Sequence, residues 1–223
     1  MKLSVIIPAF NERHTIREIV RRVIDVDIDK EIIVVDDCST DGTREMIREM
    51  EKDLPIRVVY SERNRGRGMA VRRGQRIATG EIIINQDADL EYDPTDYPAL
   101  IVPLVEGRAD AVYGSRFKGK IENMAYKNYL GNRFLTFLTN MMLGCRISDL
   151  MTGYKVVRAD ILKGMEFDTD GFEFEAELTA KLVKMGYRII EVPIAFHGRG
   201  KAEGKKIGWR DAIKVMGTLR KYR

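Results

Sequence analysis

Short apolar runs alternate with helical stripes along the first 90 residues of the chain. The runs are rich in isoleucine and valine, which is typical of strands buried on both faces of a sheet. They occupy residues 3–8, 31–35, 56–60 and 82–84. Between them, apolar residues recur at helical spacing around 16–24, 46–50 and 70–78, and Asn11 is expected to cap the first helix. This alternation predicts an α/β fold with a doubly wound, mostly parallel sheet flanked by helices.

The second half of the chain shows a different pattern. A strand is predicted at 111–113, a helix at 173–186 and another strand at 188–195. Residues 126–143 carry a broad apolar surface that is too short and too polar to span a bilayer. This segment belongs either to the core or to an amphipathic helix on a membrane. The last helix has an apolar stripe that begins at Trp209 and is surrounded by Lys and Arg.

Length and composition narrow the class of protein. The 223 residues, 32% charged and 44% hydrophobic, can bury one large core, and no repeat or linker divides them, so one domain over 1–223 is expected. No apolar stretch reaches about 18 residues, so neither a spanning helix nor a signal peptide is expected. Cys38 and Cys145 form no metal or disulfide pattern, which favours a cytoplasmic location.

Positive charge is concentrated at the C-terminus. From Arg199 to Arg223, nine Lys and Arg stand against Glu203 and Asp211, a net charge of +7. The whole chain carries +4, so the first 198 residues carry −3. A basic tail suits nucleic acid, an anionic membrane surface or solvent. Nucleic acid is not expected to bind, because the acidic strand ends described next would repel it.

Carboxylates follow two of the predicted strands. Asp36 and Asp37 follow the strand at 31–35, and Asp87 and Asp89 follow the isoleucine run at 82–84. Ligands of such sheets bind beyond the carboxyl ends of the strands. An extended Asp-x-Asp sends both side chains towards one place, where they can share a hard divalent cation, Mg²⁺ or Mn²⁺. Two surface aspartates that form a turn are the alternative.

Several segments, in order, resemble the family 2 glycosyltransferases, whose fold is called GT-A. They are Ser4–Glu12, Val34–Thr43, Asn64–Ala70, Asp87–Asp89 and Gly114–Arg116. In the third, Arg67 stands where the family usually has lysine. The resemblance covers most of residues 3–116. It implies a nucleotide-sugar and metal half at 1–116 and an acceptor half at 117–223 that ends in a basic amphipathic segment.

The resemblance also implies roles for single residues. Those expected to face the nucleotide sugar are Pro8, Phe10, Glu12, Asp37, Arg67 and Asp87. The expected metal ligands are Asp87, Asp89 and Glu91, with Asp89 central to catalysis. Helix capping by Glu12, a turn at Asp37 and a solvated loop around Arg67 are the plainer alternatives.

Two later segments are similar to dolichyl-phosphate mannose synthases and their polyprenyl-phosphate relatives. They are Ser148–Val156 and Glu191–Ile194, the latter followed by Arg199, Glu203, Gly204 and Lys205. The residues expected to bind the acceptor phosphate are Arg116, Arg133, Arg199 and Lys205, and Arg116 is also expected to be catalytic. The sequence departs from these synthases in three places. Glu91 replaces the usual glutamine, which makes the donor less certain, and an expected arginine-serine pair after Arg116 is not clearly aligned. The third is the segment Phe174–Leu178, whose carboxylates keep a glucosyl donor open, because glucose-transferring relatives carry an acid at a similar point.

These features predict a metal-dependent, inverting transfer of a hexose, with mannose favoured, from GDP-mannose or UDP-glucose to a dolichyl or polyprenyl phosphate. A phosphate monoester has a second pKa of about 6, so this acceptor needs cationic restraint more than a strong base. One alternative is a UDP-glucose-dependent polyprenyl-phosphate glucosyltransferase. Another is transfer to a glycan hydroxyl with Glu175 as candidate base. A non-catalytic sugar-nucleotide-binding scaffold is a third.

The lipid acceptor adds an expectation about location. The protein would lie at the cytoplasmic face of a membrane, held by its basic tail and amphipathic helices or by an integral-membrane partner.

Overall fold

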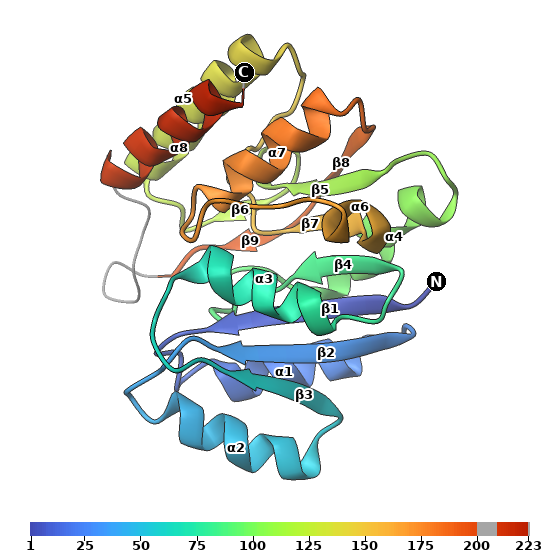
Figure 1. Cartoon of the computed structure of the whole chain (residues 1–223), viewed down its shortest axis with the longest axis vertical. Helices are drawn as coiled ribbons and strands as arrows, with labels where there is room; N and C mark the ends of the chain where they lie inside the picture. The colour runs from blue at the N-terminus through green and yellow to red at the C-terminus, as the bar shows by residue number, and fades with distance from the viewer. Residues whose placement is uncertain (200–208, 223) are drawn as a thin grey trace.

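A seven-stranded sheet forms the centre of the computed structural model, which describes residues 1–199 and 209–222. Its strand order is β3-β2-β1-β4-β7-β5-β8 (Figure 1). The strands are β1 (Leu3–Ala9), β2 (Lys30–Asp36), β3 (Ile56–Tyr60), β4 (Ile82–Asn85), β5 (Ala111–Ser115), β7 (Lys155–Arg158) and β8 (Ile189–Pro193). All neighbours pair in parallel except those of β7. The predicted mostly parallel α/β sheet is confirmed.

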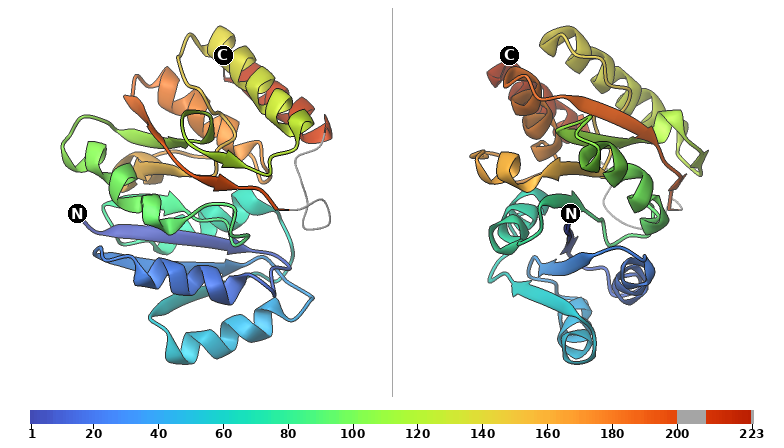
Figure 2. Two further views of the ribbon diagram at one scale, coloured as in Figure 1. Left: turned by 180° about the vertical axis from the view of Figure 1, so that it is seen from behind. Right: turned by 90° about the vertical axis from the view of Figure 1, so that its right-hand side faces the viewer.

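Helices cover both faces of the sheet. One face packs against α1 (Ile16–Asp25), α2 (Thr43–Asp53) and α4 (Tyr97–Val105), and the other against α3 (Arg67–Ile77), α6 (Ala159–Lys163) and α7 (Phe174–Lys184). The remaining long helices, α5 (Tyr126–Leu143) and α8 (Trp209–Lys221), lie side by side against α7 at one end of the molecule (Figures 1 and 2). A short sheet of β6 (Ile121–Glu122) and β9 (Phe196–His197) completes the fold.

The two-sided cover explains the continuous apolar runs of the sequence. Along β1, Leu3, Val5 and Ile7 pack with the α1 side, whereas Ile6 packs with the α3 side. All four are buried, because alternate side chains of a strand point to opposite faces and both faces of this sheet are covered. The halves predicted at 1–116 and 117–223 share this one sheet, since β7 and β8 pair with strands of the first half.

The direction of β7 brings a distant segment to the carboxyl ends of the parallel strands. Because β7 runs antiparallel, its N-terminal end lies beside the carboxyl ends of β4 and β5. Gly153, just before β7, lies so close to the end of β4 that a Cβ there would be 2.6 Å from Oδ2 of Asp87. The segment at 148–155 therefore belongs to the same rim of the sheet as the predicted carboxylates.

The structure differs from the sequence predictions in several elements. Asn11 does not cap the first helix: it has a φ of 57°, its side chain accepts from the Thr40 amide, and the helix begins at Ile16. The strand β7 and the helix α4 were not predicted. The segment at 126–143 is an amphipathic helix: Leu135 is buried and Met142 packs against the core, whereas Phe134 and Phe137 are about 60% exposed. In the described part of the chain, no helix is long and apolar enough to cross a bilayer.

Candidate active site

Asp37 lies at the end of β2, where it is buried and held by a crossing loop. Its carboxylate accepts from the backbone amides of Arg65 at 3.0 Å and Gly66 at 2.7 Å. Gly66 has a φ of +96°, and a Cβ there would lie 2.8 Å from the carbonyl oxygen of Asp170. Glycine is therefore required at this point of the loop. Asp36 instead pairs with Arg44 and stabilises the fold.

Asp87 is the first member of a buried chain of charges. Nε of Arg67 donates to Oδ1 of Asp87 at 2.7 Å, and the far end of the same guanidinium donates to Glu175. The other oxygen of Glu175 accepts from Nζ of Lys155 at 2.5 Å. Burial alone would raise the pKa of Glu175, but Lys155 and Arg67 hold that pKa below its ordinary value. Glu175 is therefore ionised and committed to two cations.

Asp89 lies in a second cluster, in which an arginine is surrounded by carboxylates. The Arg199 guanidinium donates to Asp89 at 2.9 Å and to Glu12 at 3.2 Å, and the Arg199 amide donates to Glu91 at 3.0 Å. Burial, followed by the nearby charges of Asp87 and Glu91, raises the pKa of Asp89 to about 7. Two of the expected metal ligands, Asp89 and Glu91, thus contact the same arginine.

The local backbone differs from the extended Asp-x-Asp that was predicted. Residues 88 and 89 form a turn after the end of β4, and Leu90 has a φ of 63°, a left-handed conformation that is uncommon for leucine. The Glu91 amide donates to Asp89 across this turn at 3.1 Å. The backbone at residues 88 and 89 is therefore a turn rather than an extended segment, although Asp89 still lies close to other carboxylates.

The chemistry of this cluster suits a hard divalent cation. Within residues 1–199 and 209–222, no three Asp, Glu, His or Cys side chains are arranged to hold a metal ion, and the Arg199 guanidinium lies among the carboxylates. The available donors are carboxylate oxygens, which Mg²⁺ and Mn²⁺ prefer. Asp87, Asp89 and Glu91 therefore fit such an ion by donor type.

The candidate acceptor-phosphate residues are only partly brought together. Arg116 is buried in a two-pronged ion pair with Asp149, with both N–O distances at 2.7 Å. Arg133 is exposed on α5, and its guanidinium lies 5.3 Å from the centre of the Phe117 ring. The Arg116 guanidinium lies 5.7 Å from the same ring, so the two arginines are near each other. Lys205 lies outside the described residues.

The candidates at the end of β1 line the same rim. Pro8 is half-buried at the end of the strand, Phe10 is 45% exposed, and Glu12 contacts Arg199. Nothing in the structure tests the assigned roles of the candidate residues, so these roles stay predictions.

Sequence reasoning missed residues that hold the site in place. Glu191 accepts from the amides of Ser148 at 2.7 Å and Asp149 at 3.2 Å, and it pairs with Lys118 at 2.9 Å. Asp149 in turn holds Arg116. The available signal was that Asp149 and Glu191 both belong to the segments similar to the mannose synthases.

The central sheet with helices on both faces is the fold of the GT-A glycosyltransferases. The sequence profile described as Glycosyl transferase family 2 matches residues 4–165, and the chain belongs to this family.

Curated relatives are similar over most of the chain. A protein named dolichol-phosphate mannosyltransferase from Pyrococcus furiosus is 33% identical over 215 residues, which are 93% of this chain and 60% of that protein. The chain therefore spans about three fifths of the length of that relative. A protein named undecaprenyl-phosphate mannosyltransferase from Micrococcus luteus is 30% identical over 93% of this chain and 88% of its own.

A solved structure shows the same fold. Glucosyl-3-phosphoglycerate synthase from Mycobacterium tuberculosis, in complex with Mn²⁺, uridine-diphosphate and glucosyl-3-phosphoglycerate, matches with a TM-score of 0.77 and 24% identity. The match covers 99% of this chain and 79% of that one.

Proposed function

We propose that this protein transfers a hexose, with mannose favoured, from a nucleoside-diphosphate sugar to a polyprenyl or dolichyl phosphate, with inversion and with Mg²⁺ or Mn²⁺. The observation that carries this proposal is the gathering of Glu12, Asp89 and Glu91 around one cationic side chain at the rim of the sheet. Asp87 is held beside them by Arg67. Such a rim suits a cation and the diphosphate that the cation neutralises.

The names of the relatives support the choice of acceptor. The proteins from Pyrococcus and Micrococcus are named for transfer of mannose to dolichol phosphate and undecaprenyl phosphate. The structural relative acts on a different acceptor, and at 24% identity it supports the fold alone.

Each group of residues has a part in the proposed reaction. A divalent cation held by Asp87, Asp89 and Glu91 would neutralise charge on the departing nucleotide. Asp37 would accept hydrogen bonds from the base or ribose, and Pro8 and Phe10 would border the nucleotide. Arg116 and Arg133, whose guanidinium groups both lie near the Phe117 ring, would restrain the acceptor phosphate, because guanidinium groups match phosphate oxygens. Arg199 and Lys205 would assist them.

A hydroxyl acceptor is the weaker alternative. It needs a general base, and Glu175 is the candidate. Both oxygens of Glu175 are taken, one by Arg67 and the other by Lys155. A carboxylate whose pKa is held low by two cations is a poor proton acceptor near neutral pH.

The surface of α5 suits an association with the cytoplasmic face of a membrane, directly or with an integral-membrane partner. Its large exposed side chains are Tyr126, Tyr129, Leu130, Phe134, Phe137 and Met141, and Ile213 of the neighbouring α8 is exposed as well. Lys214, Arg220 and Lys221 of α8 add positive charge. An apolar helix face with basic neighbours favours an anionic lipid surface.

A donor panel tests the proposal. Purified protein, Mn²⁺ and a short polyprenyl phosphate would be incubated with GDP-mannose, UDP-glucose, UDP-galactose or UDP-N-acetylglucosamine. Mass spectrometry of the lipid should show a hexose added from one donor. A hexosylated lipid from UDP-glucose alone would select the glucosyl alternative, and no product from any donor would contradict the lipid acceptor.

A further inference from the structure

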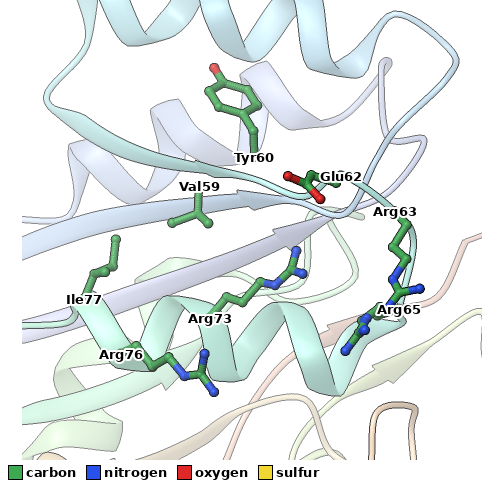
Figure 3. Close-up of a pocket in the computed structure, with 8 residues that line it drawn as sticks. All are labelled: Val59, Tyr60, Glu62, Arg63, Arg65, Arg73, Arg76 and Ile77. Carbon is green, nitrogen blue, oxygen red and sulfur yellow. The ribbon is translucent and has the colours of Figure 1, made fainter.

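Arginine side chains surround a groove beside one edge of the sheet, which we call the arginine groove. Its volume is about 720 Å³, which is within the range of sites for small molecules. Figure 3 shows Arg63 and Arg65 from the β3–α3 loop, and Arg73 and Arg76 from α3. None of the residues proposed for donor, cation or acceptor lines it.

Apolar side chains of β3 and α3 also line the groove. β3 is an edge strand, paired only with β2, and α3 packs mainly over β1 and β2. This leaves Val59 of β3 half-buried, opposite Ile77 at the end of α3. The groove therefore has an uncharged side at β3 and cationic side chains along α3 and the β3–α3 loop (Figure 3).

The charge of the groove is not balanced internally. Four arginines and one acid, Glu62, line it, so the lining carries 4 − 1 = +3. Arg63, Arg65 and Arg76 are exposed, and no carboxylate in the described part of the chain lies within ion-pair distance of them. Arg73 donates to a neutral group, the hydroxyl of Ser61.

Other arginines of the same helix behave differently. Arg67 pairs with Asp87, and Arg72 pairs with Asp170. Arg67 and Arg72 of this helix are therefore neutralised by carboxylates, whereas the arginines that line the groove are not.

We propose that the arginine groove binds a soluble ligand that carries two or more phosphate groups. A guanidinium group can donate two parallel hydrogen bonds to phosphate oxygens. The repulsion between several neighbouring arginines falls when an anion binds among them. The edge strand β3, whose residues line the groove, lies in the half of the molecule away from α5 and α8 (Figure 1). A bilayer in contact with those helices would not reach it, which favours a soluble ligand over a phospholipid headgroup.

Arg65 connects the arginine groove to the active site. The Arg65 and Gly66 amides hold the carboxylate of Asp37. An anion bound to the Arg65 guanidinium would change the position of the loop whose amides hold Asp37. This part of the inference rests on the proposed function, and it predicts that occupancy of the groove changes nucleotide affinity.

Calorimetry with inorganic tripolyphosphate, in low salt and EDTA, tests the site itself. The wild-type protein should bind the anion, and Arg73→Gln/Arg76→Gln should bind it about tenfold or more weakly. Arg21→Gln/Arg220→Gln, which removes the same charge from exposed positions elsewhere, should bind like wild type. No binding by wild type, or equal binding by all three, would overturn the proposal. If the double variant fails to fold, Arg76→Gln alone serves, since that side chain is exposed.

Two further measurements separate the parts of the inference. Binding to phosphatidylglycerol vesicles should be unchanged in Arg73→Gln/Arg76→Gln; selective loss there would identify a lipid headgroup and overturn the soluble ligand. Tripolyphosphate should shift the Kd for GDP or UDP in wild type and not in the variant. An unchanged Kd would overturn the coupling to Asp37, whereas failure of sugar transfer would leave the calorimetric result standing.

Discussion

Nε of Arg67 lies 2.7 Å from Oδ1 of Asp87, and this contact ties the rim of the sheet to a buried ion-pair chain. Behind Arg67, Glu175 and Lys155 are almost completely buried. Removing one member of a buried ion pair leaves the other charge buried without a partner, so the position of each residue in this chain depends on its neighbour. We propose that Glu175 positions Asp87 through Arg67 in this arrangement, while its role as the candidate base stays a prediction.

Glu175→Gln tests this role. We expect lower thermal stability and about 10- to 100-fold weaker Mn²⁺ affinity, since residues that orient metal ligands have effects of this size. Loss of a true general base would lower kcat by about 10²- to 10⁴-fold and leave Mn²⁺ affinity unchanged. Mn²⁺ titration by electron paramagnetic resonance, with the exposed Glu166→Gln as control, separates the two outcomes.

Gly153→Ala is expected to displace Asp87. The new Cβ would lie 2.6 Å from Oδ2 of Asp87, and the flexible carboxylate would move before the backbone does. The variant should fold and bind Mn²⁺ about tenfold more weakly. Gly217→Ala on α8, whose Cβ would meet nothing within 4 Å, is the matched control. Wild-type Mn²⁺ affinity in Gly153→Ala would argue that Asp87 does not bind the cation.

Arg199 is expected to compete with the divalent cation for the rim carboxylates. Its guanidinium occupies the space between Asp89 and Glu12, so a divalent ion must displace it. Arg199→Ala should therefore bind Mn²⁺ about fivefold more tightly in the absence of donor, because a partly exposed ion pair contributes on the order of 1 kcal/mol. Sugar transfer should fall, because a cation for the phosphates is lost. The exposed Arg133→Ala should leave Mn²⁺ affinity as in wild type, and equal affinities in all three proteins would contradict the competition.

The cation affinity is expected to depend on pH. Burial and the neighbouring carboxylates of Asp87 and Glu91 raise the pKa of Asp89 to about 7. Below that pH the carboxyl group is protonated and must lose its proton to bind a cation, so Mn²⁺ affinity should fall by about tenfold per pH unit below 7. Above pH 7 the affinity should level off. Titrations between pH 5.5 and 8.5 check this, and a flat profile would show that Asp89 stays ionised throughout.

The exposed face of α5 leads to a prediction about membranes. Phe134→Ser/Phe137→Ser should reduce sedimentation with phosphatidylglycerol vesicles and leave the melting temperature close to that of wild type, because both rings are about 60% exposed. Val102→Ser/Val105→Ser, on exposed positions of α4, is the control. Binding by wild type should weaken as salt rises. Vesicle binding that does not depend on salt, or that the α5 substitutions leave unchanged, would indicate that the exposed face of α5 binds a partner other than an anionic membrane.

The sequence predicts those parts of the fold in which local pattern and tertiary burial agree. β1, β2 and β4 are continuous apolar runs because both faces of the sheet are covered. β7 was missed because it begins with Lys155, whose burial depends on Glu175, 20 residues away. α4 was missed because it contains Pro98 and Pro103, which the tertiary structure accommodates at and within a helix.

The candidate site shows the same limit. The positions of Asp37, Asp87 and Asp89 at the rim follow from their places at strand ends. Their partners do not: Arg199 lies 110 residues from Asp89 and 187 from Glu12. Contacts over such distances come from the folded chain, and no local pattern encodes them.

The decisive test of the proposed cation site is Mn²⁺-dependent hexose transfer to a short polyprenyl phosphate by Asp87→Ala/Asp89→Ala, measured by mass spectrometry of the lipid. Asp25→Ala/Asp27→Ala is the matched control, because those exposed aspartates have the same spacing on another surface. We expect product from wild type and the control, and a loss of about 10³-fold or more in the rim variant. Undiminished transfer by Asp87→Ala/Asp89→Ala would contradict the proposed mechanism.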